Sequence, residues 1–102
     1  MIGLIDDNRT AIEALCREYH VATLEVFGSA SVGAFDPKRS DVDLLVEFHR
    51  SDETDAADQY FGLLEALESL LGRHVDLVCA RAIRNPYFMK GVNQSRRLLY
   101  AA

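Results

Sequence analysis

Helical spacing of apolar residues marks three segments of the chain. Apolar side chains three and four positions apart predict an amphipathic helix over 8–19 and a second, leucine-rich helix over 60–71. Gly72 directly follows the second segment, at the position where glycine commonly ends a helix. An Asn-Pro pair has the sequence of a helix N-terminus and predicts a last helix over 85–99.

Three short segments between these helices are apolar and rich in β-branched residues, a pattern typical of buried strands. They span 21–27, 41–48 and 74–79. The stretch between the first two contains Gly33 and Pro37, which favour a turn or a brief helix. Because only about 13 residues connect these two strands, we expect them to pair antiparallel. The sequence predicts an α/β fold with a three-stranded mixed sheet and about four helices, in the order α-β-(short α or turn)-β-α-β-α.

Composition and charge narrow the classes of protein. The 102 residues, 49% hydrophobic and 26% charged, predict one globular domain over 1–102. The net charge of −5 disfavours a dedicated nucleic-acid-binding protein, although 81–102 carries basic residues and no acid. No apolar run approaches the about 18 residues that a membrane helix needs, and the N-terminus lacks the features of a signal peptide. We therefore expect a cytoplasmic protein in which Cys16 and Cys79 are reduced, small apolar residues.

Three aspartates occupy unusual positions. Asp41 and Asp43 are two residues apart on a predicted strand, so both side chains point to one face, about 6.6 Å apart along it. Asp76 has the same setting in another predicted strand, because 75–78 repeats the pattern of 42–45. A lone Asp-x-Asp pair could simply be the polar outer face of a strand. The repeated pattern favours carboxylates that converge on a hard cation such as Mg²⁺ or Mn²⁺, which also holds waters and substrate phosphates.

A Gly-Ser pair follows the first predicted strand. Gly28 at a strand end would let backbone N–H groups approach a phosphate closely, and the hydroxyl of Ser29 adds a donor. Alone, the pair indicates only an ordinary turn. Followed first by the Asp-x-Asp pair and then by the third aspartate, it becomes a candidate phosphate site.

This order of residues resembles the minimal nucleotidyltransferases (MNT) of the DNA polymerase beta-like superfamily. The likeness is carried by Phe27-Gly28-Ser29, by Ser40-Asp41-Val42-Asp43 and the apolar strand after it, and by Val75-Asp76-Leu77-Val78. The resemblance implies two sets of site residues: Gly28, Ser29 and Ser40 as nucleotide-binding residues, and Asp41, Asp43 and Asp76 as catalytic metal ligands.

Two features depart from the family pattern. Eleven residues separate Ser29 from Asp41, one more than in many minimal members, but the extra residue falls in a loop, where insertions are tolerated. Ala30 and Val32 stand where many members carry arginines. Their absence could weaken binding of a triphosphate.

The resemblance also implies a reaction and a partner. Two Mg²⁺ ions, with Mn²⁺ as a substitute, would assist nucleotidyl transfer from ATP, with Asp76 as a ligand and possible general base. Members similar to this chain are typically antitoxins paired with a HEPN ribonuclease toxin, and some adenylylate a tyrosine of that toxin. We therefore expect a protein adenylyltransferase that acts as an antitoxin in a hetero-oligomer, with no direct nucleic-acid or membrane partner.

Two alternatives remain open at this point. The chain could neutralise its partner by binding alone, without chemistry, as the missing arginines suggest. It could also transfer a nucleotide to a small molecule or an RNA end, although no acceptor pocket is evident in the sequence.

Histidines and aromatic pairs receive a structural interpretation. His20, His49 and His74 lie at the edges of predicted strands without ligand spacing, so we assign them no role. The pairs at 60–61 and 87–88 fall on leucine-rich or apolar helix stripes and are expected to be core residues rather than base-stacking platforms.

Overall fold

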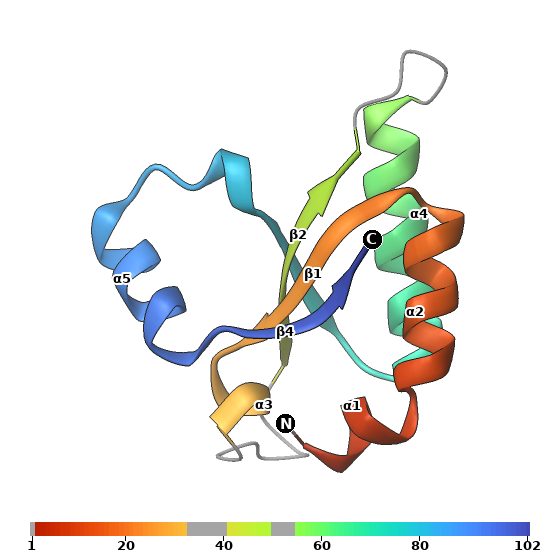
Figure 1. Ribbon diagram of the computed structural model, residues 1–102, viewed down its shortest axis with the longest axis horizontal. Coiled ribbons are helices and arrows are strands. Elements are labelled where there is room, and N and C mark those ends of the chain that lie inside the picture. The colour runs from red at the N-terminus through yellow and green to blue at the C-terminus, as the bar shows by residue number, and fades with distance from the viewer. Residues whose placement is uncertain (1, 33–40, 50–54) are drawn as a thin grey trace.

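The computed structural model describes residues 2–32, 41–49 and 55–102 (Figure 1). Gly33, Pro37 and Ser40 of the sequence interpretation lie outside these ranges. The elements in chain order are α1 (Gly3–Asp7), α2 (Arg9–Glu18), β1 (Val21–Phe27), α3 (Ser29–Val32), β2 (Val42–Phe48), α4 (Ala56–Leu71), β3 (Val75–Cys79), the 3₁₀ turn η1 (Ala80–Ala82), α5 (Pro86–Ser95) and β4 (Arg97–Ala101).

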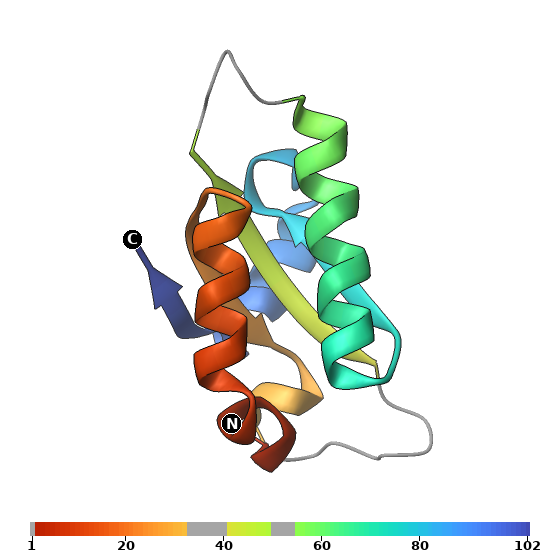
Figure 2. The ribbon, with the colours of Figure 1, turned by 90° about the vertical axis from the view of Figure 1, so that its right-hand side faces the viewer.

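The strands form a mixed sheet in the order β3-β2-β1-β4. β1 is antiparallel to both β2 and β4, whereas β2 is parallel to β3. The predicted mixed sheet and the antiparallel first pair are thus confirmed. Helices α2 and α4 lie side by side on one face of the sheet, and α5 lies on the other (Figures 1 and 2).

The predicted number of strands was wrong because the last helix ends early. α5 stops at Ser95, and 97–101 forms β4, so that the described residues contain a four-stranded sheet and five α-helices. The segment pairs with β1 through Leu24↔Tyr100 and its neighbours, and Leu99 is buried in the core. Its short apolar run is compatible with a helix or a strand. It forms a strand because the edge of β1 offers unpaired backbone N–H and C=O groups.

The beginning of the chain also differs from the prediction. The helix expected over 8–19 is preceded by α1, and the two helices meet at Asn8. The side-chain amide of Asn8 donates to the carbonyl of Leu4 at 2.8 Å, which satisfies one of the free carbonyls at the end of α1.

Caps set the ends of the other two long helices as predicted. Gly72 ends α4 in the left-handed conformation, at φ +67°. The side chain of Asn85 accepts from the backbone N–H of Tyr87 and of Phe88, and Pro86 occupies the first turn of α5. At the start of α4, Asp55 caps in the same way.

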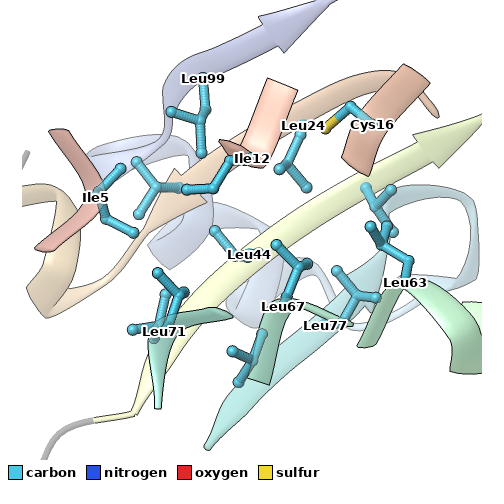
Figure 3. Close-up of a cluster of buried hydrophobic side chains, with 14 of the residues drawn as sticks. Ile5, Ile12, Cys16, Leu24, Leu44, Leu63, Leu67, Leu71, Leu77 and Leu99 are labelled. Carbon is cyan, nitrogen blue, oxygen red and sulfur yellow. The ribbon is translucent and has the colours of Figure 1, made fainter. Parts of the chain in front are cut away.

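The main core lies between the sheet and helices α1, α2 and α4 (Figure 3). Its fully buried side chains include Ile12, Leu24, Leu44, Leu63 and Leu67. Cys16 is also buried, as predicted, and burial raises the pKa of its thiol to about 12. Cys79 is half-buried, and both cysteines are free. None of the helices in the described ranges is long and apolar enough to cross a membrane.

A second, smaller cluster joins α5 to the opposite face of the sheet. Phe27, Leu45 and Val92 are its buried members. The Phe88 ring packs edge to face on Phe27, with ring centroids 6.1 Å apart. Tyr87, in contrast, is 85% exposed.

The core interpretation of the aromatic pairs therefore holds only in part. Tyr60 is half-buried, and its hydroxyl donates to the carbonyl of Leu77. Phe61, Tyr87 and Phe88 are exposed, so the prediction was wrong for them, although the Phe88 ring still contacts Phe27. Apolar spacing identifies a helix face, but whether another element covers that face depends on the tertiary fold.

An ion pair holds the junction of α5 and β4 to β1. The guanidinium of Arg96 donates to both carboxylate oxygens of Glu25, at 2.6 and 2.9 Å, and the Glu25 side chain is only 17% exposed. These hydrogen bonds lower the pKa of Glu25 against the effect of burial.

Replacing Arg96 with alanine is expected to destabilise the fold by about 1–3 kcal/mol at pH 7, because Glu25 would keep its charge in a largely buried position. Urea unfolding would measure the difference, with Arg97→Ala at the neighbouring first residue of β4 as the control. Because the folded-state pKa of Glu25 is lowered, the pair stabilises the fold at neutral pH and this contribution is lost as the pH falls through that pKa. An equal loss in both variants would show that the ion pair contributes nothing specific.

Candidate active site

The candidate residues meet where the end of β1 lies beside the starts of β2 and β3. Because β1 runs antiparallel to β2, its last residue Phe27 pairs with Asp43. Because β2 runs parallel to β3, Asp43 in turn pairs with Asp76. Partners in neighbouring strands point to the same face about 5 Å apart, so the two carboxylates lie side by side. Asp41 immediately precedes β2 and shares this side of the strand.

The turn after β1 is in close contact with Asp43. Gly28 has φ +68°, a conformation that L residues rarely adopt. A Cβ atom at this position would lie 2.5 Å from Oδ2 of Asp43. Glycine is therefore required here both by the backbone conformation and by the approach of the carboxylate.

Like charges accumulate around Asp43. Partial burial and the charges of Asp76 and Asp41 together raise the pKa of its carboxyl to about 6, and His74 opposes them. Asp41 and Asp76 themselves are exposed. A carboxylate with these neighbours is stabilised when a proton or a cation binds to it.

The donor set fits a hard divalent cation that is completed by other ligands. Within the described ranges, no three His, Cys, Asp or Glu side chains form a ready-made metal cluster. Mg²⁺ does not require one, because it is usually bound by one or two carboxylates together with waters and substrate phosphates. The paired carboxyls of Asp43 and Asp76, with oxygen donors only, match that pattern.

The remaining predicted residues are placed as follows. Ser29 begins α3 directly after Gly28 and is half-buried. Ala30 is fully buried in the main core, whereas Val32 is 56% exposed, so the two positions without arginines have different environments. Ser40, predicted to bind nucleotide, lies outside the described residues, as does most of the loop that contains the additional residue.

Sequence reasoning missed two neighbours of the site. His74, which received no role, has its Nδ1 3.2 Å from Oδ2 of Asp41. Its position two residues before Asp76 was a usable signal, because alternate residues of a strand share a face. Ser95 is hydrogen-bonded to Gly28 from the end of α5, and no local pattern pointed to it.

The raised pKa of Asp43 predicts a pH dependence of stability. The folded state keeps this proton up to about pH 6, whereas the unfolded chain loses it near the ordinary aspartate pKa of 3.8. Between these values the folded state binds more protons, so its stability without divalent cations should fall as the pH rises. Asp43→Asn should flatten this decrease and raise the melting temperature at pH 7.5. Thermal unfolding in EDTA from pH 4.5 to 7.5 would measure it, and parallel profiles of the two proteins would contradict it.

A glycine turn against paired aspartates on neighbouring strands is chemically suited to phosphate oxygens and a hard cation. Comparison with known families makes the class specific. The family model described as "Nucleotidyltransferase domain" matches residues 9–99. The chain therefore belongs to the nucleotidyltransferase family, in its minimal form, and is a nucleotidyltransferase.

Two relatives come from Methanocaldococcus jannaschii. The chain is 39% identical over 80 residues to "Putative protein adenylyltransferase MJ0128", covering 78% of each chain. It is 35% identical over 77 residues to "Putative protein adenylyltransferase MJ1379", covering 76% of this chain and 75% of the relative.

Solved structures share the fold. A structure described as a putative minimal nucleotidyltransferase superposes with a TM-score of 0.75 at 32% identity, covering 94% of this chain and 95% of the other. A toxin-antitoxin structure with AMP-PNP gives 0.71 at 27% identity, covering 93% and 74%. The complex of a tri-AMPylated Shewanella oneidensis HEPN toxin with an MNT antitoxin gives 0.65 at 24% identity, covering 95% and 72%, and shows a common fold.

Proposed function

We propose that this protein transfers AMP from ATP to a hydroxyl group of a partner HEPN toxin and thereby acts as its antitoxin. The observation that carries the proposal is the half-buried carboxyl of Asp43, which lies against the Gly28 turn and beside Asp76. The names of the two relatives, and the AMP-PNP in the similar toxin-antitoxin structure, support ATP as the nucleotide donor.

One set of site residues would bind the cation, and another would bind the phosphates. Asp41, Asp43 and Asp76 would hold Mg²⁺, or Mn²⁺ in its place, and the bound ions would neutralise the triphosphate and the leaving pyrophosphate. The backbone of Gly28 and the hydroxyl of Ser29 would bind phosphate oxygens. Ser40 is proposed to join them on the family resemblance alone.

The reaction is a displacement at phosphorus. The acceptor oxygen forms a bond to the α-phosphorus of ATP, the bond from this phosphorus to pyrophosphate breaks, and the hydroxyl proton leaves. Asp76 is the candidate to accept this proton, because it is exposed on the same face as Asp43. The carboxylates and the turn are held by adjacent strands. They would accelerate the reaction chiefly by positioning the reactants.

The charge of the chain favours a protein as the acceptor. The described residues form one layer of sheet with helices on both sides. The net charge of −5 is unfavourable for an RNA acceptor and compatible with a protein.

Intact mass spectrometry of the partner tests the proposal. The protein encoded by the neighbouring reading frame would be co-expressed with this chain, and the purified pair incubated with ATP and Mg²⁺. We expect the partner to gain mass in steps of one AMP unit with the wild-type chain and not with Asp43→Asn. If the partner binds tightly but gains no mass with ATP or any other nucleoside triphosphate, the proposal fails.

The second candidate is neutralisation by binding alone. The observation that favours it is the absence of arginines at Ala30 and Val32. The double variant Asp41→Asn/Asp43→Asn distinguishes the two functions in cells that express the toxin. Full protection by this variant would show that docking is sufficient, whereas loss of protection with the complex intact would show that catalysis is required.

A further inference from the structure

The Gly28 turn is tied to the end of α5 by Ser95. The backbone N–H of Gly28 donates to Oγ of Ser95 at 2.9 Å, across 67 residues of sequence. The hydroxyl of Ser31 donates to the backbone carbonyl of Ser95. Ser31 is only 2% exposed, and its own backbone N–H donates to the carbonyl of Gly28 at 3.1 Å. These three residues thus form a closed set of hydrogen bonds around the turn.

Ser95 is itself held from both sides. Before it, Val92 is buried against Phe27 and Leu45, which anchors the last turn of α5 to the sheet. Directly after it, Arg96 makes the two hydrogen bonds to Glu25. Because these contacts restrain the backbone of Ser95, its side chain can fix the position of another segment.

The position of the turn matters because it is packed against Asp43. The contact at Gly28 leaves no room for even one additional carbon atom beside the Asp43 carboxylate. A small shift of the turn would therefore change the spacing between the groups proposed to bind the triphosphate and the carboxylate proposed to bind its cation. The hydrogen bond from Gly28 to Ser95 opposes such a shift.

We propose that Ser95 is a positioning residue for the nucleotide: its hydroxyl holds the Gly28–Ser29 turn at the distance from Asp43 that binding of a Mg²⁺-bound nucleoside triphosphate requires. This inference rests on the proposed nucleotide transfer and assigns a role to α5, which lies beyond the Gly-Ser and aspartate motifs. Ser95 acts through Gly28 and makes no bond in the reaction.

Calorimetric binding of AMP-PNP with Mg²⁺ to the full chain tests this role. Ser95→Ala should weaken binding about three- to tenfold, the amount that one hydrogen bond typically contributes. Ser95→Thr keeps the acceptor oxygen and should bind nearly as the wild type does. The matched control is Ser69→Ala, at an exposed position on α4, which should leave binding unchanged.

Kinetics separate positioning from a general loss of structure. In the transfer assay, Ser95→Ala should raise the KM for ATP by a similar factor and leave the KM for the partner protein unchanged. A merely structural role would lower the melting temperature without this selective effect. If Ser95→Ala does not fold, Ser31→Ala, which removes the bond to the Ser95 carbonyl, should weaken AMP-PNP binding in its place.

The outcomes distinguish this inference from the proposed function. If the wild-type chain binds AMP-PNP and Ser95→Ala binds as tightly as Ser69→Ala, the positioning role is refuted and the proposed function stands. If Ser95→Thr is as weak as Ser95→Ala, the hydroxyl is not the relevant group and the role is also refuted. If the wild-type chain binds no nucleotide, the proposed function and the role of Ser95 fail together.

Discussion

Asp43→Asn is expected to reduce nucleotide transfer about a thousandfold or more, because it removes the negative charge nearest the centre of the site. The carboxyl of Asp43 touches the Gly28 turn on one side and pairs with Asp76 on the other. Asparagine has nearly the same size and should preserve the packing around Gly28. The loss would therefore report the charge and not the shape of the side chain.

The measurement is transfer of radiolabelled AMP to the co-purified partner, with the fold checked by circular dichroism. Asp7→Asn, which neutralises an exposed acid at the end of α1, is the matched control and should transfer at the wild-type rate. Transfer by Asp43→Asn within about tenfold of the wild type would exclude Asp43 as a metal ligand in the reaction.

We expect Asp43 also to connect the proposed activity to the stability of the fold. The same half-burial and like charges that raise its pKa make its ionised form unfavourable at neutral pH. The asparagine variant should thus be more stable than the wild type without divalent cations and inactive with them. A gain in stability together with a loss of activity is expected when a residue is kept for function although it destabilises the fold.

Gly28→Ala is expected to reduce transfer about a hundredfold, since displacement of reacting groups by about 1 Å can have that effect. The added Cβ would lie 2.5 Å from Oδ2 of Asp43, so either the turn or the carboxylate must move. Alanine at φ +68° would also strain the backbone by about 1–2 kcal/mol.

Gly72→Ala is the control that separates these two effects. Gly72 has φ +67° at the end of α4, but nothing lies within 4 Å of an added Cβ. Both variants should lose a similar amount of stability from backbone strain, measured by urea unfolding, and only Gly28→Ala should lose transfer. Equal rates for the two variants would show that the contact between the turn and Asp43 is unimportant.

Much of the fold could be predicted because its signals are local. Asn85 and Pro86 marked the start of α5, and Gly72 marked the end of α4, because capping depends on a few neighbouring residues. The three strands up to β3 stood out as short β-branched runs between helices. Segment 97–101 was misassigned because the conformation of a short apolar run depends on the element that it packs or pairs with. Here that element is the edge of β1, which the sequence does not reveal.

For the site, the amino-acid sequence by itself determined which groups are present: a glycine turn after one strand, and aspartates at alternating positions that share a face. Strand periodicity is local, so this much follows from the residue order. The contact of Gly28 with Asp43, the pairing of Asp43 with Asp76, and the bond from Gly28 to Ser95 were decided only by the tertiary structure. These contacts depend on strand register and on where α5 ends, and both result from packing between segments far apart in the chain.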